Sequence, residues 1–323
     1  MKVLVTGAGG FIGSHLTELL VKKGHEVSAF VRYNSTNRWG WLENSSVKNN
    51  INVVTGDLRD YDSVYDTVRN VDTVFHLGAL IGIPYSYVSP MAYIKTNVEG
   101  TYNILEASRK CGIKRVVHTS TSETYGTAQY VPIDEKHPCN PQSPYAATKA
   151  SADHLALSYF RSFELPLTVI RPFNTYGPRQ SARAIIPTII SQIISGKRNI
   201  RLGNLTPTRD LNYVEDTALG FYEVGLHEKT IGDAFNLGTG KEISIGDLVK
   251  KIIDILGEEV VIEIDKSRLR PEKSEVERLM ADASKAMNLT GWKPQFSLDE
   301  GIRKTAEWIK ENIGIFKTDI YNV

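Results

Sequence analysis

The chain has 323 residues, a formal net charge of +1, 41% hydrophobic residues and 23% charged residues. A chain of this length can bury a sizeable core without crosslinks, and its composition is that of a globular protein, neither disordered nor membrane-embedded. A net charge so close to zero provides no long-range attraction to nucleic acid or anionic lipid, so we expect neither as a partner.

Short β-branched runs alternate with longer helical periods from residue 2 to about residue 171. The predicted strands are residues 3–6, 26–31, 52–55, 73–76, 115–119 and 167–170. Between the first two strands, an apolar stripe marks a helix that Gly24 should end as a C-cap; its members are Phe11, Ile12, Leu16, Leu19 and Leu20. This alternation is typical of an α/β fold, a Rossmann-type doubly wound parallel sheet with helices on both faces.

The second half of the chain is less regular, and we expect it to form a smaller C-terminal substrate lobe. Helices are predicted near residues 185–195, 215–226 and 245–256. Ser297 and Glu300 form a capping box before a final helix whose apolar face is Leu298, Ile302, Ala306, Ile309 and Ile313. We therefore assign residues 1–175 to a dinucleotide-binding domain, with 211–238 returning to it. Residues 176–210 and 239–323 are assigned mainly to a lobe that binds a nucleotide sugar.

A glycine-rich turn, TGAGGFIG, separates the first predicted strand from the first helix. Gly7, Gly10 and Gly13 let the backbone turn tightly, and Phe11 and Ile12 open the helix. The free N–H groups and the positive dipole end of a helix N-terminus attract the pyrophosphate of a dinucleotide. The turn therefore predicts a cofactor site.

Tyr145 and Lys149 lie four residues apart on a helix that Ser143 should cap and Pro144 should begin. A lysine ammonium close to the phenol, together with the positive charge of an oxidised nicotinamide, favours phenolate, so the tyrosine could accept a proton near neutrality. The fifth predicted strand ends in HTSTSETYG, which places Thr121, Ser122 and Glu123 at the carboxyl edge of the sheet, where doubly wound folds bind ligands.

The spacing TGxxGxxG, followed at this distance by YxxxK, resembles the extended short-chain dehydrogenases of the NAD-dependent epimerase/dehydratase family, along nearly the whole chain. The resemblance implies catalytic roles for Tyr145, Lys149 and Thr121. It implies cofactor contacts at Asp57 and Leu58 in TGDL, at Leu77 and Ala79 in HLGA, and at the helix-bending Asn97. It also implies substrate contacts at Pro84, Asn174, Arg209 and Arg270, and a homodimer formed by the helices near residues 93–111 and 145–162.

The end of the second predicted strand departs from the family's usual NAD pattern, because Arg32 stands where a carboxylate is expected. An arginine there can pair with the 2′-phosphate of NADP or stack on the adenine of either cofactor. Arg38 is the nearest second basic group. The choice stays open, and we slightly favour a tightly bound NAD, as in many bacterial relatives.

Glu123 points to the reaction. Simple sugar 4-epimerases lack a carboxylate at this position, whereas nucleotide-sugar 4,6-dehydratases and uronate decarboxylases resemble this pattern. In the dTDP-glucose type an aspartate stands at the position of Ser122 and helps carbon 6 lose its hydroxyl, so the proton donor here is open.

The whole chain, including the RYNSTNRWGWL loop, resembles bacterial 4,6-dehydratases that act on UDP- or GDP-linked N-acetylhexosamines in pseudaminic and legionaminic acid biosynthesis. The same chemistry could also act on an unsaturated 5,6-ene sugar as the substrate. The alternatives are a UDP-glucuronate decarboxylase, a nucleotide-sugar epimerase and, more remotely, a non-enzymatic dinucleotide sensor. Such sensors tend to lose the tyrosine or the lysine, and both are present here.

The remaining sequence features predict an ordinary cytoplasmic enzyme. The two cysteines, Cys111 and Cys139, show neither metal-ligand spacing nor a partner that suggests catalysis, so we expect idle thiols and no metal site. Residues 1–7 lack the basic and apolar segments of a secretory signal, and the apolar runs are too short to cross a bilayer.

Overall fold

Seven parallel strands form the central sheet of the computed structural model, which describes residues 1–320. They are β1 (Lys2–Thr6), β2 (Glu26–Arg32), β3 (Ile51–Gly56), β4 (Thr73–His76), β5 (Arg115–Thr119), β6 (Leu167–Pro172) and β10 (Ala234–Leu237). Their order is β10-β6-β5-β4-β1-β2-β3, so Val3 of β1 pairs with Val27 on one side and Thr73 on the other. The order reverses between β1 and β4, and ligands of doubly wound sheets bind beyond the carboxyl ends of strands at such a switch point.

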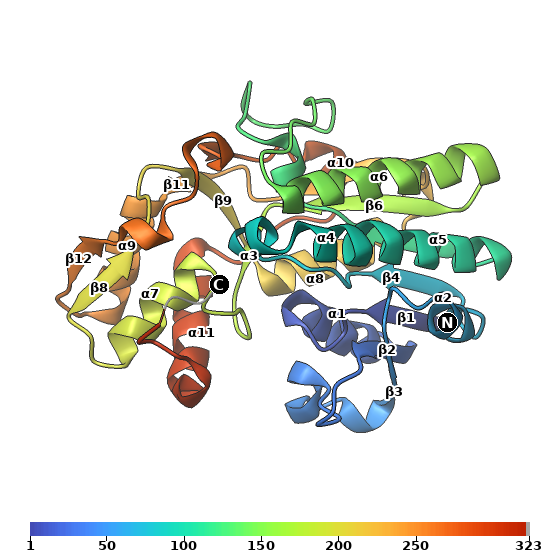
Figure 1. Cartoon of the computed structure of the whole chain (residues 1–323), viewed down its shortest axis with the longest axis horizontal. Helices are drawn as coiled ribbons and strands as arrows, with labels where there is room; N and C mark the ends of the chain where they lie inside the picture. The colour runs from blue at the N-terminus through green and yellow to red at the C-terminus, as the bar shows by residue number, and fades with distance from the viewer. Residues whose placement is uncertain (321–323) are drawn as a thin grey trace.

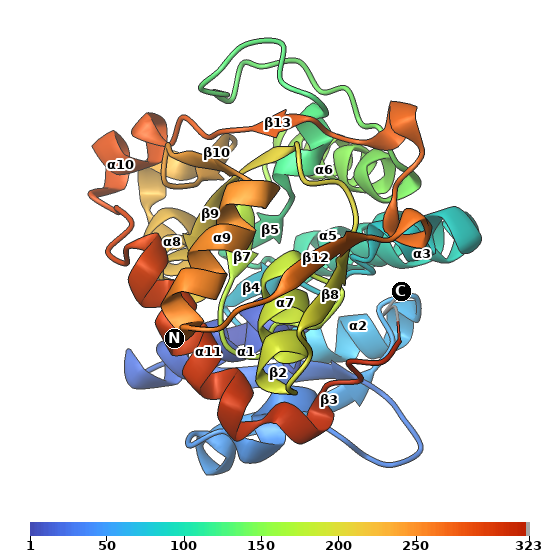
Figure 2. The same cartoon turned by 90° about the vertical axis from the view of Figure 1, so that its left-hand side faces the viewer.

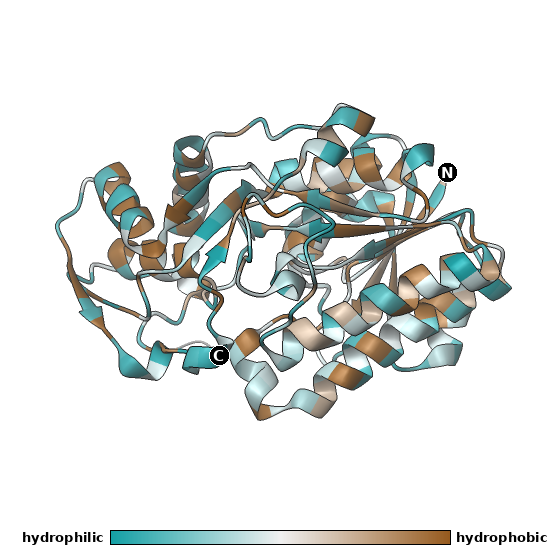
Figure 3. Ribbon diagram, turned by 90° about the horizontal axis from the view of Figure 1, so that it is seen from above, coloured by the Kyte–Doolittle hydropathy of each residue, from teal (hydrophilic) through white to brown (hydrophobic). Residues whose placement is uncertain are grey.

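Helices cover both faces of this sheet, as the sequence predicted (Figure 1). One face packs against α1 (Phe11–Lys22) and α8 (Val214–Leu226), and the other against α2 (Tyr61–Val68), α5 (Gly100–Lys110) and α6 (Pro144–Phe163). Successive residues of β1 serve opposite faces, since Val3 and Val5 lie in the first core and Leu4 in the second. Both faces are buried, so the strands are hydrophobic along most of their length (Figure 3).

The predicted helix ends are confirmed by their capping residues. Gly24 follows α1 with a φ of 81°, a left-handed conformation that glycine adopts without steric cost. The Ser143 hydroxyl accepts a hydrogen bond from the Ala146 N–H at 3.1 Å, and Pro144 begins α6. Ser297 and Glu300 form the capping box of α11 (Leu298–Glu311).

The smaller lobe is built from α7 (Ile185–Ile194), α9 (Ile245–Leu256), α11 and several short strands (Figure 2). The strands are β7 (Asn174–Tyr176), β8 (Asn199–Leu202), β9 (Thr208–Tyr213), β11 (Glu242–Ser244), β12 (Val261–Ile264) and β13 (Arg278–Leu279). β9 pairs with β7, β11 and β13, whereas β8 pairs with β12. The helices were predicted from the sequence but these strands were not, because segments of two to six residues show too little periodicity.

The two parts of the chain are interleaved. β10 pairs with β6 in parallel, with Phe235 opposite Ile170. The segment around α10 (Ser284–Thr290), which we expected in the smaller lobe, instead packs with the large domain, where Ala283, Ala286 and Trp292 join the core beside α1 and α8. These apolar residues complete a face of the large sheet. No linker in the sequence marks the point at which the chain returns from the smaller lobe to the large domain. Among residues 1–320, no helix is long and apolar enough to span a membrane.

Candidate active site

The glycine turn leaves room at the N-terminus of α1. Gly10 is the N-cap of this helix, and no side chain caps its first turn. A Cβ added to Gly10 would meet only the carbonyl oxygen of Gly7 within 4 Å, whereas a Cβ on Gly13 would collide with the backbone of Gly7 and Ala8. Gly13 is therefore required for the helix to approach the turn. Gly10 leaves open space in front of the free N–H groups in the first turn of α1. This arrangement fits a dinucleotide pyrophosphate.

The loops after β3 and β4 lie beside the glycine turn. A Cβ on Gly78, in the HLGA loop, would press against the Leu58 side chain and the N–H of Gly7. The Gly78 N–H donates a hydrogen bond to the Thr6 hydroxyl at 3.0 Å, and the Asn103 amide donates to the Leu58 carbonyl at 2.8 Å. The structure thus brings the predicted cofactor residues of TGDL and HLGA to one place.

The loop between β2 and β3 also supports the turn, a contact that was not predicted from the sequence. The Trp41 N–H, in the short helix η1 (Gly40–Asn44), donates a hydrogen bond to the Gly9 carbonyl at 3.0 Å. The Trp41 ring meets the Trp308 ring of α11 at 5.2 Å between centroids. The loop therefore connects the glycine turn with the C-terminal helix.

Arg32 lies at the carboxyl end of β2, opposite Gly56 and close to Asp57. The Arg59 guanidinium, which donates to the Asp57 carboxylate at 2.9 Å, holds the pKa of that carboxyl below its usual range, and Arg32 contributes in the same direction. The side chain of Asp57 is thus engaged by Arg59. Arg32 is exposed at the place where the adenosine ribose of a dinucleotide would bind.

We expect Arg32→Ala to weaken NADP binding far more than NAD binding if the guanidinium pairs with a 2′-phosphate, and to weaken both alike if it stacks on adenine. Loss of a charge-assisted hydrogen bond should cost about 1.5–3 kcal/mol. Calorimetric titration with each cofactor measures the difference, and Arg69→Ala, at an exposed arginine paired with Asp66, serves as the control. An unchanged affinity for both cofactors would remove Arg32 from the site.

Tyr145 and Lys149 are buried on the first two turns of α6, with exposed fractions of 8% and 4%. The Tyr93 ring meets the Tyr145 ring edge to face at 6.3 Å between centroids. Burial raises the pKa of Tyr145, although the Thr121 side chain opposes that rise as a hydrogen-bonding neighbour. Burial also lowers the pKa of Lys149 to about 8.

The pKa of Tyr145 therefore moves opposite to the direction that proton abstraction needs, and the predicted lowering also relied on the positive charge of an oxidised nicotinamide. The physical reason is that removing the phenol from water disfavours its charged form more than its neighbours favour it. An added positive charge, such as that of an oxidised nicotinamide, would act in the required direction.

Thr121, Ser122 and Glu123 follow β5 and are buried. Thr121 caps the short helix η4 (Ser122–Tyr125) by accepting a hydrogen bond from the Glu123 N–H at 3.3 Å. The charge of Glu123 raises the pKa of Tyr145, and it also opposes the effect of burial on the pKa of Arg209. The structure thus places the buried Glu123 carboxylate within electrostatic reach of the predicted catalytic tyrosine and of one predicted substrate arginine.

Asn97 lies in the π-helical turn η3 (Ile94–Glu99) and joins the cofactor loop to the catalytic helix. Its amide oxygen accepts from the Leu80 N–H at 2.8 Å, and its amide nitrogen donates to the Leu80 carbonyl and to the Thr148 hydroxyl at 3.0 and 3.1 Å. Asn97 therefore holds the HLGA loop against the helix that carries Tyr145.

The predicted substrate residues come from four separate segments. Pro84 is in the first turn of α3 (Ile83–Val88), Asn174 begins β7 and Arg209 lies on β9. The Asn174 amide oxygen is buried and has no hydrogen-bond partner in the described chain. Arg209 and Arg270 both contact one oxygen of Glu275, each at 3.4 Å. Glu275 was missed, since a glutamate in a charged loop gives no sequence signal.

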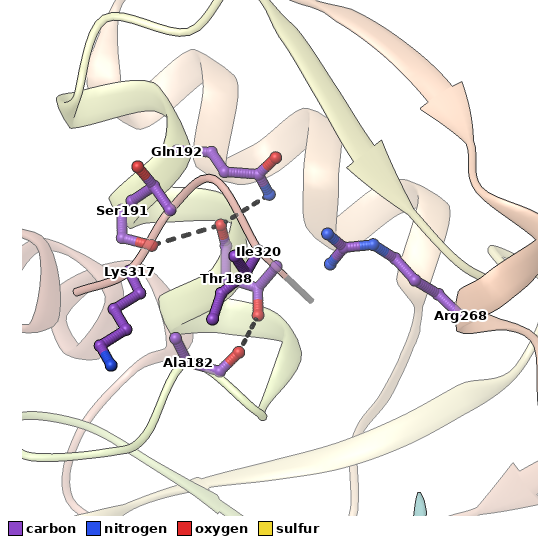
Figure 4. Close-up of a pocket in the computed structure, with 8 residues that line it drawn as sticks. Ala182, Thr188, Ser191, Gln192, Arg268, Lys317 and Ile320 are labelled. Carbon is purple, nitrogen blue, oxygen red and sulfur yellow. Dashed lines mark hydrogen bonds between the residues drawn. The ribbon is translucent and has the colours of Figure 1, made fainter. Parts of the chain in front are cut away.

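A separate hollow lies in the smaller lobe, between α7 and the C-terminal segment (Figure 4). The Thr188 hydroxyl donates to the Ala182 carbonyl at 2.6 Å, and Lys197 anchors the C-terminal segment through the Thr318 carbonyl and the Asp319 carboxylate at 2.5 and 2.9 Å. None of the residues predicted for catalysis or cofactor binding lines this hollow.

Comparison with known proteins agrees with this geometry. Residues 4–305 match the family model described as GDP-mannose 4,6 dehydratase. The chain is 33% identical to the dTDP-glucose 4,6-dehydratase of Streptomyces antibioticus over 97% of this chain and 93% of that protein. It is 34% identical to the UDP-glucose 4-epimerase of Mycolicibacterium smegmatis over 96% of this chain and 99% of that protein.

A solved structure shares the fold. The UDP-glucuronic acid 4-epimerase of Bacillus cereus, in complex with UDP-glucuronic acid and NAD, superposes with a TM-score of 0.87 and 29% identity, over 97% of this chain and 100% of that one. Dehydratases and epimerases are thus both among the relatives. With its Rossmann sheet, glycine turn and buried tyrosine and lysine, the chain belongs to the NAD-dependent epimerase/dehydratase family of short-chain dehydrogenases.

Proposed function

We propose that the protein is a nucleotide-sugar 4,6-dehydratase that acts on a UDP- or GDP-linked N-acetylhexosamine or its 5,6-ene derivative. The observation that carries this proposal is the buried carboxylate of Glu123, which lies beside Tyr145 and Arg209. A dehydratase needs a base for carbon 5 in addition to the base for the carbon 4 hydroxyl, and a second buried acid next to Tyr145 suits that need.

A dinucleotide held at the glycine turn, for which we favour tightly bound NAD over NADP, would supply the redox chemistry by accepting the carbon 4 hydride and giving it back at carbon 6. Tyr145 removes the proton of the carbon 4 hydroxyl, while Thr121 holds that hydroxyl and Lys149 supplies positive charge. The open space at Gly10 and the uncapped start of α1 suit the pyrophosphate of the cofactor.

The ketone at carbon 4 makes the hydrogen on carbon 5 acidic, and Glu123 takes this proton. The hydroxyl of carbon 6 leaves as water with a proton from Glu123, Ser122 or a held water molecule. Addition of the hydride at carbon 6 and return of a proton to carbon 5, from Glu123 or solvent, would complete a 4-keto-6-deoxy sugar. Asn174, Arg209 and Arg270 bind the diphosphate of the substrate, because a planar guanidinium can chelate its oxygens, and Pro84 borders the sugar.

Epimerase activity is the second candidate, because 4-epimerases with 34% and 29% identity cover nearly the whole chain. A UDP-glucuronate decarboxylase would use the same first oxidation but would act on a uronate. A non-enzymatic sensor has less support, since Tyr145 and Lys149 are both present and both buried.

The test is to incubate the protein with a panel of UDP- and GDP-sugars and to detect by mass spectrometry the loss of one water molecule. We expect a 4-keto-6-deoxy product from an N-acetylhexosamine. Substrate deuterated at carbon 4 should give product that carries the label at carbon 6. Return of the label to carbon 4 with inversion would identify an epimerase, and release of carbon dioxide from a uronate would identify a decarboxylase.

We also expect a homodimer formed by the helices near residues 93–111 and 145–162. Large apolar side chains are exposed on and next to these helices: Tyr85, Val88, Met91, Ile94, Tyr102 and Phe163. Exposed apolar side chains gathered on neighbouring helices mark interaction surfaces. Light scattering should give twice the monomer mass at micromolar concentration, and Tyr102→Glu should shift the protein toward the monomer. A wild-type monomer would contradict the expectation.

A further inference from the structure

A buried carboxylate, Asp153, lies on the catalytic helix α6 itself and has no part in the proposed reaction. It is 1% exposed and receives hydrogen bonds from the ends of two neighbouring strands. The Ser120 hydroxyl, after β5, donates to it at 2.6 Å, and the Arg171 guanidinium of β6 donates at 3.1 Å. His118 of β5 lies 3.2 Å from its second oxygen.

Asp153 follows Lys149 by four residues on α6, so the two side chains lie on the same face of the helix, one turn apart. Both are almost completely buried, so water screens their attraction only weakly. Burial lowers the pKa of Lys149, and the carboxylate of Asp153 acts in the opposite direction. Asp153 is thus the anion that counteracts the desolvation of the lysine.

The other titratable groups packed around this lysine do not replace Asp153. His76 of β4 and His118 of β5 are fully buried, and burial lowers the pKa of both imidazoles. Arg171 is a second cation in the same layer, and its guanidinium also donates to the Tyr125 hydroxyl at 3.0 Å. Without Asp153, the cations Lys149 and Arg171 would both be buried here without a carboxylate. The two histidines could not compensate, because they carry no charge at neutral pH.

We propose that Asp153 is a positioning residue for the reaction: held by the ends of β5 and β6, its carboxylate is the counter-ion that keeps Lys149 an ammonium beside Tyr145. The link to the reaction rests on the proposed function, in which a charged lysine assists the phenol, but the counter-ion role itself can be tested without a substrate. Ser120 and Arg171 affect the lysine only indirectly, because they hold the carboxylate of Asp153 in place.

The experiment is to titrate Lys149 directly in the protein as purified, with competitive labelling by an amine-reactive anhydride across a pH series and peptide mass spectrometry as the readout. In the wild type the midpoint should lie at about 8. Asp153→Asn should move it to lower pH by about 1–3 units, the usual effect of losing a nearby opposite charge. Ser120→Ala removes one hydrogen bond but keeps the carboxylate, so its midpoint should remain near that of the wild type.

A second variant covers the case in which Asp153→Asn does not fold because Arg171 is left without its carboxylate partner. The double variant Asp153→Asn, Arg171→Met removes both members of the buried ion pair and should still lower the midpoint, since the Asp153 carboxylate, one turn away on the same helix, is the charge that raises the pKa of the lysine. An unchanged midpoint in a folded variant would overturn the proposal. If no nucleotide sugar reacts, the proposed function fails while this measurement stands.

With an active substrate, the pH profile gives a second readout. Lys149 is charged below its pKa, so the rate of cofactor reduction should fall on the alkaline side as the lysine loses its proton. In Asp153→Asn this alkaline limb should move to lower pH together with the labelling midpoint. A residue with only a structural role would lower stability and leave the limb in place.

Discussion

Glu123→Gln should still reduce the bound cofactor when substrate is added, but it should stall before water is lost. The oxidation at carbon 4 depends on Tyr145, which this variant retains, whereas removal of the carbon 5 proton depends on the carboxylate. General acid and general base roles are each worth about a hundredfold to ten-thousandfold, so product formation should fall by at least the lower of these factors. Absorbance of the reduced nicotinamide and mass analysis of the sugar measure the two steps separately.

A matched control for this variant is Glu135→Gln. Glu135 is another partly buried carboxylate, and one of its oxygens accepts a hydrogen bond from the Asn236 N–H at 2.8 Å. The glutamine oxygen can accept the same bond, so dehydration should continue. A fully active Glu123→Gln enzyme would end the dehydratase assignment and leave the dehydrogenase fold unaffected.

Gly10→Val should empty the cofactor site and with it abolish activity. Gly10 has φ −80° and ψ −177°, an extended conformation that valine adopts readily, so the protein should still fold. The added side chain would occupy the open space before the first turn of α1, where we expect the pyrophosphate. Absorbance of protein-bound nicotinamide after purification measures the loss.

Gly314→Val is the control for this second variant. Nothing lies within 4 Å of a Cβ added there, so the same change should leave the cofactor content as it is. Unchanged cofactor in Gly10→Val would show that the dinucleotide lies elsewhere.

The sequence predicted those parts of the structure that depend on local patterns. Strands such as residues 73–76 and 115–119 were correctly placed because both faces of the sheet are buried and apolar runs repeat between helices. The caps at Gly24, Ser143 and Ser297 were recognisable because a single residue type meets the geometric need. The position of Tyr145 and Lys149 on α6 followed from the same kind of local signal.

The features that the sequence did not reveal depend on contacts between distant segments. Glu275 meets Arg209 across 66 residues, and the Trp41 N–H reaches Gly9 only because η1 folds back on the glycine turn. The return of Ala283 and Ala286 to the large core depends on packing with residues of α1 and α8, which no single segment encodes. Asp153 could have been noticed, since it continues the spacing of Tyr145 and Lys149 by one more helical turn.

The late arrival of β10 has a consequence for biosynthesis. β10 completes the sheet beside β6, but it follows β6 by roughly 60 residues, so a ribosome that adds about 5–20 residues per second leaves β6 without its outer neighbour for about 3–12 s. During that interval an apolar strand with open N–H and C=O groups is available to other nascent chains. Chaperone binding to ribosome-bound chains should therefore be strongest for those that end between β6 and β10.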